Sequence, residues 1–152
     1  MNAPYPTHLS PQQRAERVAA RMLERDRAAA DLGLSLNHTA PGAASISLTV
    51  ETRHLNGHDI CHGGVIFTLA DTAFAIACNS YNQVVVAQHN TISFVTPAQL
   101  GEVLTAVASE TAKEGRNGIY DVQVTTETGR VIAHFRGCSR VIQGVHFEEN
   151  KG

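Results

Sequence analysis

The sequence has little cysteine, little net charge and no long hydrophobic run. Three cysteines are too few, and odd in number, for a disulfide framework, which suits the reducing cytoplasm. Twelve Lys and Arg against fourteen Asp and Glu leave no basic field to attract nucleic acid or an anionic membrane. No apolar stretch could span a bilayer, and residues 1–6 lack the regions of a signal peptide. We therefore expect a single-domain cytoplasmic protein whose partners include neither nucleic acid nor membrane.

A helix is predicted near the N-terminus. Ser10 is a typical N-cap, Pro11 suits the first helical position and Gly33 suits a C-cap, so the helix should run over Gln12–Leu32. Five arginines lie between residues 14 and 27, interleaved with acidic residues. We interpret them as a solvated helix face with i,i+4 pairs, and a docking surface for anionic phosphates is the alternative.

The middle of the chain predicts a strand and then a buried helix. Residues Ser45–Val50 alternate polar and apolar side chains, which is typical of a half-buried strand. Residues Val65–Ser80 are apolar around nearly the whole circumference of a helix. Such a helix must be buried on every side.

Four strand-like runs follow, separated by turn residues: Val84–Val95, Val103–Ala112, Ile119–Thr126 and Val131–Val141. The pairs Asn117-Gly118 and Thr128-Gly129 are typical of turns that close antiparallel hairpins. The tail from Gln143 to Gly152 is expected to be frayed. A long sheet buries a single apolar helix only by wrapping around it, so we predict an α+β fold. Oligomerisation commonly covers the edges and outer face of such a sheet.

Asp71 is the first candidate for chemistry. It lies inside the apolar helix, where an unpaired carboxylate costs several kcal/mol or becomes protonated. A general base or nucleophile that faces a cleft would explain its presence. The alternative is a structural carboxylate bonded to Thr68, Thr72 or the neighbouring backbone.

The loop before this helix is the second feature. His62-Gly63-Gly64 places two glycines at the helix start, where unpaired N–H groups and a partial positive charge favour an anion or a developing oxyanion. The alternative is a pair of glycines needed only for a tight turn. Asn56 precedes the loop, and its amide would donate to a carbonyl or orient a water. The alternative for Asn56 is an ordinary turn with Gly57.

The spacing of these residues limits how they can act together. Gly63 and Asp71 are separated by about 12 Å along one helix. A reacting carbonyl must lie about 3 Å from both the oxyanion donor and the attacking group. If both residues act, they must therefore come from different subunits across a pair of antiparallel helices. The protein is then at least a homodimer with two sites.

Metal binding and cysteine catalysis are competing interpretations. His54, His58 and His62 recur every four residues beside Cys61, and these ligand types suit zinc. The glycines in the same stretch argue against the continuous helix that would align them. We therefore expect no metal and no cofactor. Cys61 beside His62 could form an activated pair, but nothing in the sequence lowers the pKa of a thiol.

The string NGHDICHGG at Asn56–Gly64, followed by LADTA at Leu69–Ala73, resembles the hotdog-fold acyl-CoA thioesterases, and most closely their PaaI-like branch. The resemblance covers roughly Leu32–Val141, and the N-terminal helix suits the same branch. It implies a long antiparallel sheet around the Val65–Ser80 helix, dimers with a continuous sheet and commonly homotetramers. We accordingly divide the chain into an N-terminal helical extension (1–31), a hotdog domain (32–142) and a frayed tail (143–152).

The resemblance also implies a role for each motif residue. Asp71 would be the catalytic carboxylate, and the Gly63 N–H of the other subunit would polarise the thioester carbonyl. Asn56 would hold the thioester or the attacking water. His62 would shape the loop and contact the acyl group.

The substrate implied is an acyl-CoA thioester, which is hydrolysed to a carboxylic acid and free CoA. Aromatic acyl groups, phenylacetyl or its ring-hydroxylated derivatives, follow from the resemblance alone. A hydroxyl is often found beside the carboxylate in this family, and the turn near residue 116 offers groups for the CoA phosphates. The candidate substrate-binding residues are Gly64, Thr72, His89, Lys113, Arg116 and Asn117. The acyl pocket would be lined by the buried helix and the strand Gln88–Asn90, and the alternative for His89 is a satisfied sheet residue. For the last three the alternative is solvated turn residues.

The mechanism and two other functions stay open. Asp71 would activate water as a general base or attack directly to form an anhydride. A hydratase or dehydratase on the same scaffold would need a paired His and carboxylate, and His62 does not share the helix of Asp71. A non-catalytic CoA-binding module would bind ligand without turnover.

Overall fold

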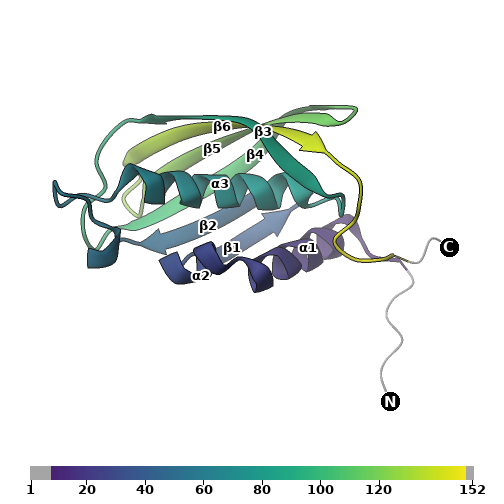
Figure 1. Cartoon of the computed structure of the whole chain (residues 1–152), viewed down its shortest axis with the longest axis horizontal. Coiled ribbons are helices and arrows are strands. Elements are labelled where there is room, and N and C mark those ends of the chain that lie inside the picture. Colours follow the sequence, from purple (N-terminus) through teal and green to yellow (C-terminus); the bar gives the residue numbers. More distant parts are fainter. Residues whose placement is uncertain (1–7, 150–152) are drawn as a thin grey trace, which may run out of the picture.

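A six-stranded antiparallel sheet forms most of the fold in this computed structural model, which describes residues 8–149 (Figure 1). The strand order is β1-β2-β4-β5-β6-β3, so β1 and β3 are the two edges. Residues 1–6, considered above for a signal peptide, lie outside the described residues. The sheet confirms the predicted α+β class. Its strands are β1 Ser35–Ala40, β2 Ala43–Thr49, β3 Val85–Phe94, β4 Val103–Glu114, β5 Asn117–Thr126 and β6 Val131–Val141.

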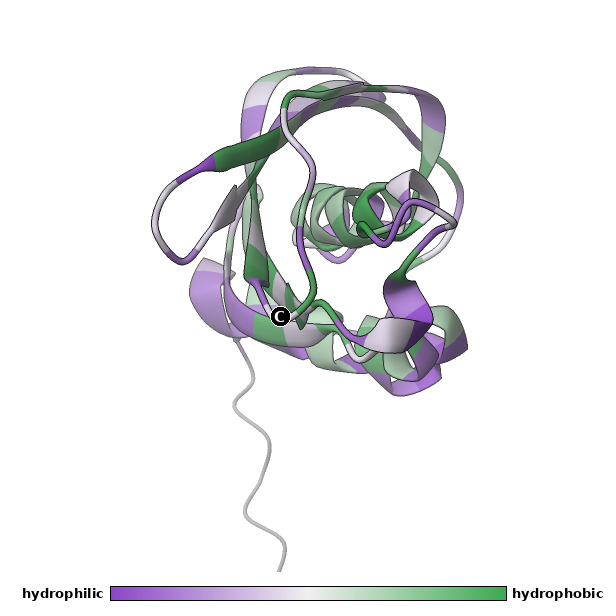
Figure 2. Ribbon diagram, turned by 90° about the vertical axis from the view of Figure 1, so that its left-hand side faces the viewer, coloured by the Kyte–Doolittle hydropathy of each residue, from purple (hydrophilic) through white to green (hydrophobic). Residues whose placement is uncertain are grey.

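The long helix α3 (Gly63–Asn79) lies in the concave side of this sheet, as its apolar sequence predicts. Figure 2 shows the sheet curving around the helix. Leu69 and Phe74 are fully buried, and the Phe74 ring packs 5.7 Å from the ring of Tyr120 on β5. Gly137 on β6 permits this close approach, because a Cβ there would lie 2.6 Å from the Phe74 ring. The helix therefore has one close-fitting position against the sheet.

The predicted N-terminal helix is in fact two helices, α1 (Pro11–Arg25) and α2 (Arg27–Leu32). Asp26 causes the break, because its backbone is extended and its side chain accepts a backbone N–H bond of 2.9 Å at the start of α2. The expected ends are confirmed: Ser10 caps α1, and Gly33 ends α2 with a φ of +80°. Within residues 8–149, no helix combines the length and apolar character needed to span a membrane.

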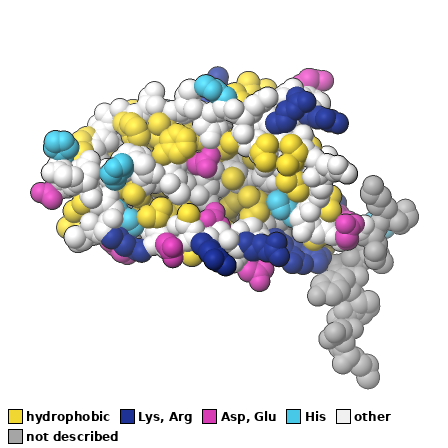
Figure 3. Space-filling model, viewed as in Figure 1, with side chains coloured by type: hydrophobic (Ala, Val, Ile, Leu, Met, Phe, Trp, Pro, Cys, Tyr) yellow, Lys and Arg dark blue, Asp and Glu magenta, His cyan; other side chains and the backbone are white. Residues whose placement is uncertain are grey.

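Two arginines of α1 contact the C-terminal segment. Arg14 makes a two-point ion pair with Glu149 at 2.7 and 2.9 Å, and the guanidinium of Arg17 lies 4.4 Å from the centroid of the Phe147 ring. The i,i+4 interpretation is therefore wrong for Arg14, whose partner is 135 residues away. Figure 3 shows basic side chains along the edge that α1 and α2 form.

The C-terminal segment up to residue 149 packs on the fold and is not frayed. Phe147 is buried. Asn82, which follows α3, accepts bonds from the N–H groups of His146 and Phe147 and donates to the Phe147 carbonyl and to Glu149. The sequence prediction failed because these anchors lie more than 60 residues away. Residues 150–152, the end of the predicted tail, lie outside the described residues.

Two strand features differ from the sequence prediction. The strand β1 was not predicted, because most of its side chains are exposed and it has no alternating pattern. The turn between β4 and β5 is Gly115-Arg116 and not Asn117-Gly118. Glu114 pairs with Asn117, and Gly115 takes the positive φ of +56° that the turn requires.

Candidate active site

The N-terminus of α3 forms one part of the candidate site. His62 is its N-cap, and its Nδ1 accepts the Gly64 N–H at 2.9 Å. The His62 carbonyl accepts the N–H groups of Val65 and Ile66. The Gly63 N–H has no hydrogen-bond acceptor among residues 8–149. A free N–H at the positive end of a helix suits an oxyanion, and here the N–H of Gly63 is available whereas that of Gly64 is already used.

Phe94, at the end of the edge strand β3, covers this glycine. A Cβ at position 63 would lie 3.1 Å from the Phe94 ring, so a larger residue would push the ring away. The Phe94 side chain is 53% exposed. Glycine at position 63 therefore lets an exposed aromatic ring pack closely on the first residue of α3.

Asn56 forms a turn and also keeps a free donor. Its Oδ1 accepts the N–H groups of His58 at 2.9 Å and Ile60 at 3.4 Å, which confirms the turn interpretation. Its Nδ2 has no acceptor among the described residues. The turn thus fixes the position of an amide group that is available to donate to a carbonyl or a water.

One small pocket joins these two donors. Its volume is about 260 Å³, and both Asn56 and Gly63 line it. The rest of its lining is mostly apolar and comes from the loop before α3, the first turn of α3 and the end of β3 with the segment after it: Ile60, Cys61, Ile66, Phe94, Val95, Thr96 and Pro97. An apolar pocket with two polar donors suits an apolar ligand that carries a carbonyl.

Asp71 lies about two turns further along α3 and does not line this pocket. Its Oδ1 accepts a 2.9 Å bond from Nδ2 of Asn90 on β3. Burial raises the pKa of Asp71 above its ordinary value, the bond from Asn90 lowers it, and the charge of Asp26 raises it. The Thr72 hydroxyl donates to the Thr68 carbonyl, so the structure pairs Asp71 with Asn90 and not with these threonines.

Thr72 itself does not face the carboxylate. Its side chain is buried, with an exposed fraction of 7%, and its hydroxyl is bonded within α3. Successive helix residues point about 100° apart, which directs Thr72 toward the core while Asp71 lies on the partly exposed face. The expected hydroxyl beside Asp71 is therefore not supplied by Thr72.

The structure places His89 on the wrong face for the predicted acyl pocket. The pairing of β3 with β6 has a bulge between Ala87 and His89. Asn90 faces α3, as its bond to Asp71 shows, so the adjacent His89 points to the other face of the sheet, where it is exposed. A bulge decides which residues of a strand face inward, and it cannot be read from the strand's own sequence.

The predicted CoA-binding residues lie far from the pocket within one chain. Lys113, Arg116 and Asn117 are exposed on the β4–β5 hairpin, near the C-terminal end of α3 (Figure 1). The Nζ of Lys113 lies 3.7 Å from the centroid of the Tyr81 ring, just after α3. The pocket is at the opposite end of that helix, beside Gly63.

The histidines of the suggested zinc site do not converge. His54 is buried, with Nδ1 accepting the Glu51 N–H and Nε2 bonded to the Leu32 carbonyl. His58 is exposed in the turn, and His62 caps α3. In the part of the chain that the structure describes, no three metal-ligating side chains come together.

The two buried cysteines of the site region are also poor nucleophiles. Burial raises the pKa of Cys61 to about 11 and that of Cys78 to about 12. Both thiols are therefore protonated near neutral pH. Cys61 contributes to the pocket as an apolar wall.

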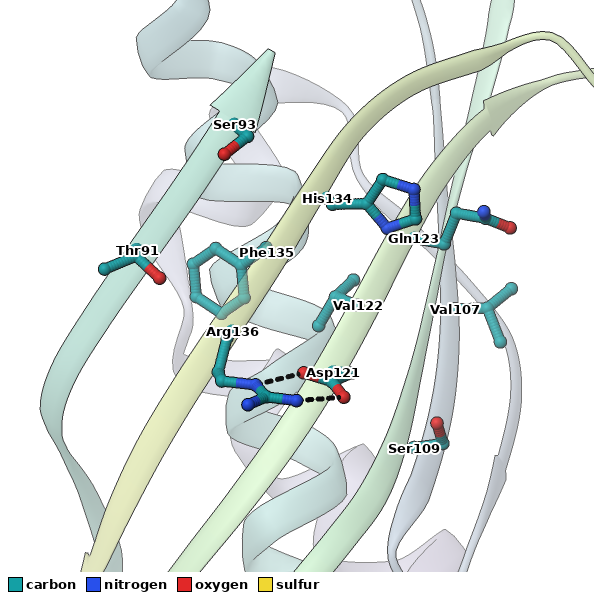
Figure 4. A pocket seen from close by; sticks show the side chains of 10 residues that line it. All are labelled: Thr91, Ser93, Val107, Ser109, Asp121, Val122, Gln123, His134, Phe135 and Arg136. Carbon is teal, nitrogen blue, oxygen red and sulfur yellow. Dashed lines mark hydrogen bonds and ion pairs between the residues drawn. The ribbon is translucent and has the colours of Figure 1, made fainter. Parts of the chain in front are cut away.

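A separate hollow lies on the outer face of the sheet (Figure 4). Asp121 and Arg136 face each other there through bonds of 2.6 and 2.8 Å, and the guanidinium holds the pKa of Asp121 below its ordinary value. Thr91 and Ser93 of β3 line the same hollow. They alternate with Asn90, which faces α3, so the sheet separates this hollow from the carboxylate that Asn90 binds.

Comparison with known proteins identifies the family. The model of the thioesterase superfamily matches residues 58–133. The acyl-coenzyme A thioesterase PaaI of Escherichia coli (strain K12) is 42% identical over 123 residues, which cover 81% of this chain and 88% of that protein.

Solved structures agree. The E. coli PaaI protein from the phenylacetic acid degradation operon superimposes with a TM-score of 0.88 at 40% identity, covering 90% of this chain and 99% of that one. A point mutant of the phenylacetic acid degradation protein PaaI from Thermus thermophilus superimposes with a TM-score of 0.74 at 34% identity. That match covers 77% of this chain and 100% of the other. These matches confirm the resemblance to PaaI-like proteins, and the chain therefore belongs to the thioesterase superfamily and has its hotdog fold.

Proposed function

We propose that the chain hydrolyses acyl-CoA thioesters with an aromatic acyl group, phenylacetyl or a ring-hydroxylated derivative, in sites that two subunits share. One observation carries the proposal. The free Gly63 N–H and the Asp71 carboxylate lie on the same helix, about 12 Å apart. Neither activates a thioester alone, and one chain cannot present both to one carbonyl.

The free edge of β3 supports a second copy of this chain as the missing half. β3 pairs with β6 on one side and has no neighbouring strand on the other within the described chain. Val86, Phe94 and Val95, on or beside this strand, are exposed. A two-fold axis that pairs two β3 edges sets the two α3 helices antiparallel. Asp71 of one subunit then approaches Gly63 of the other.

Two such dimers would form the homotetramer that the family resemblance implies. The outer face of the sheet is the surface left for this contact, and Val107 is 50% exposed there. Size-exclusion chromatography with light scattering measures the molar mass of the assembly, and we expect the mass of a dimer or a tetramer. A chain that is active as a monomer would contradict the shared site.

The chemistry follows from the two halves. The thioester oxygen accepts the Gly63 N–H, with Nδ2 of Asn56 as a second donor, while Asp71 faces the carbonyl carbon. Asp71 either removes a proton from the attacking water or attacks to form an anhydride that water then hydrolyses. In both routes the C–S bond breaks, one water is consumed, and the products are a carboxylic acid and the CoA thiol.

The antiparallel pairing also gives the hairpin cations a role. It places the C-terminal end of one α3 near the N-terminal end of the other, so the hairpin with Lys113 and Arg116 approaches the partner's pocket. Cations at that position would bind the CoA phosphates. The aromatic preference is supported by the apolar pocket beside Phe94 and by the phenylacetic acid degradation proteins among the relatives.

Replacing the carboxylate tests the reaction. We expect Asp71→Asn to fold and bind acyl-CoA while lowering kcat about 100- to 10,000-fold in a thiol-release assay. The matched control is Asp31→Asn, which removes an exposed carboxylate from α2 and should keep wild-type turnover. Wild-type turnover in Asp71→Asn would defeat the assignment.

A panel of substrates tests the acyl group. Phenylacetyl-CoA and its hydroxylated forms should give higher kcat/KM than straight-chain acyl-CoA of similar size. An enoyl-CoA in the same panel should release thiol or remain intact. Water addition to its double bond without thiol release would instead indicate a hydratase, and binding of every ester without turnover would indicate a CoA-binding module.

Mixed dimers test the shared site. Asp71→Ala chains lack the carboxylate, and Gly63→Pro chains lack the N–H, yet proline suits the first residue of a helix. Each mixed dimer regains one intact site, so random mixing should recover about a quarter of wild-type activity. Confirmed mixed dimers without activity would show that both groups act within one chain.

A further inference from the structure

We propose that Asn90 is a positioning residue that orients Asp71 and keeps its carboxylate ionised for attack. The proposal rests on the proposed function of Asp71. The two side chains come from different elements, β3 and α3, and meet through the 2.9 Å bond from Nδ2 to Oδ1. This bond is the one that the structure gives the Asp71 side chain within residues 8–149.

The local structure of β3 is arranged for this contact. The bulge between Ala87 and His89 sets the register so that Asn90 faces the helix. Opposite Asn90 on β6 is Gly137, whose missing side chain lets the Phe74 ring, and with it α3, pack closely against the sheet. Asn90 therefore reaches Asp71 from an edge strand that is otherwise largely exposed.

The other end of the Asn90 amide shows that the contact has a cost. Its Oδ1 is buried and has no hydrogen-bond partner in the described chain. A buried unsatisfied acceptor is unfavourable, and an apolar residue of the same size would avoid it. The reversed amide would set Oδ1 against the Asp71 carboxylate, which works only if that carboxyl is protonated. With Nδ2 toward Asp71, Asn90 donates a hydrogen bond that an ionised carboxylate accepts.

The surroundings explain why Asp71 needs such a partner. Burial and the charge of Asp26, at the junction of α1 and α2, both raise the pKa of Asp71. On α3 the Cys78 thiol is the other titratable group that Asp71 influences, and it is held protonated by burial. On β3, His89 points to the opposite face. Only the bond from Asn90 acts in the opposite direction and lowers the pKa.

The test is the pH profile of kcat/KM, whose acid limb reports the free enzyme's base. Asn90→Leu keeps the branched shape of the side chain and removes the donor, so the midpoint of the acid limb should move up by about one pH unit. Asn90→Asp is isosteric and adds a second carboxylate, so the limb should move further up. Asp26→Asn keeps the helix cap and removes a charge, so the limb should move slightly down.

Thr91→Val is the matched control on the same strand. Thr91 lines the outer hollow, so its variant should leave the limb unchanged. If either Asn90 variant folds, as judged by circular dichroism, and its limb does not move, the proposal is overturned. Because Asp71→Asn is assayed separately, an inactive Asp71→Asn with unshifted Asn90 variants rejects only the role of Asn90. An active Asp71→Asn rejects the proposed function itself.

Discussion

The ring of Phe94 lies over Gly63 at the first residue of α3, with 3.1 Å between the ring and the place of a Cβ at residue 63. This contact joins the edge strand β3 to the helix end that carries the free N–H. Gly63 therefore matters in two respects: its N–H is an available donor, and its lack of a side chain leaves room for the Phe94 ring. Different substitutions separate the two.

We expect Gly63→Ala and Gly63→Pro to differ. Alanine keeps the N–H and displaces Phe94 by a few tenths of an ångström, so kcat/KM should fall about tenfold through misplacement of the pocket wall. Proline makes the same contact and also removes the N–H, so kcat should fall about 100- to 1,000-fold. Thiol release by phenylacetyl-CoA measures both.

A second substitution separates the causes. Phe94→Leu should restore part of the activity of Gly63→Ala and none of that of Gly63→Pro. Gly57→Ala is the matched control, because a Cβ at Gly57 meets nothing within 4 Å. Equal losses in the alanine and proline variants would show that the N–H of Gly63 is not the oxyanion donor.

Much of the fold follows from local pattern. α3 was predicted because residues apolar on every side of a helix have to be enclosed, and the strands β2 to β6 were predicted from their own runs of residues. The break at Asp26 was not predicted, because the residues before and after it are good helix formers. The break is marked by the capping bond that the Asp26 side chain accepts at the start of α2. Helix propensity alone does not distinguish one continuous helix from two helices separated at Asp26.

The residues of the candidate site also fall into those that local sequence predicts and those that it does not. Asn56, His62 and Gly63 share one short loop, so their spacing predicts that they lie close together. Asn90 was expected only as part of a strand that lines the acyl pocket, and Phe94 was not assigned a role. Each contacts α3 across the fold, after a bulge that changes the inward face of β3. Such contacts depend on register between distant strands.

The anchoring of the C-terminal segment predicts a large stability effect at Asn82. Its φ is +64°, and its side chain holds the backbone of His146 and Phe147. We expect Asn82→Ala to lower the free energy of unfolding by about 2–4 kcal/mol, because buried bonds are lost and alanine is strained at this φ. Asn82→Gly loses the same bonds without the strain and should cost about 1 kcal/mol less.

Urea unfolding followed by circular dichroism suits this measurement, because the chain has no tryptophan. Asn37→Ala is the control: it removes only solvent-exposed hydrogen bonds, to Ser45 and Ser47, and should change stability by less than about 0.5 kcal/mol. If Asn82→Ala matched this control, the bonds between Asn82 and the C-terminal segment would contribute nothing to the stability of the fold.

Glu102 predicts a pH-dependent stability effect near the pocket. The N–H of Gln99 and the guanidinium of Arg130 both bond its carboxylate and lower its pKa from an ordinary value of 4.5. Arg130 also donates to the carbonyl of Pro97, which lines the pocket. Because the folded pKa is depressed, the stabilisation is present above about pH 4.5 and is lost as the pH falls through the folded pKa.

We therefore expect Glu102→Gln to be less stable than wild type by about 1 kcal/mol at pH 7, a modest amount because both partners are partly exposed. The difference should shrink as the pH falls below about 4.5 and vanish once the wild-type carboxylate is protonated as well. Glu114→Gln removes the same charge from an exposed residue with no ion pair in the described chain and serves as the control. Urea unfolding over a series of pH values from 7 downward decides the matter, since a difference that does not shrink on acidification would mean that Glu102 acts through packing and not through its charge.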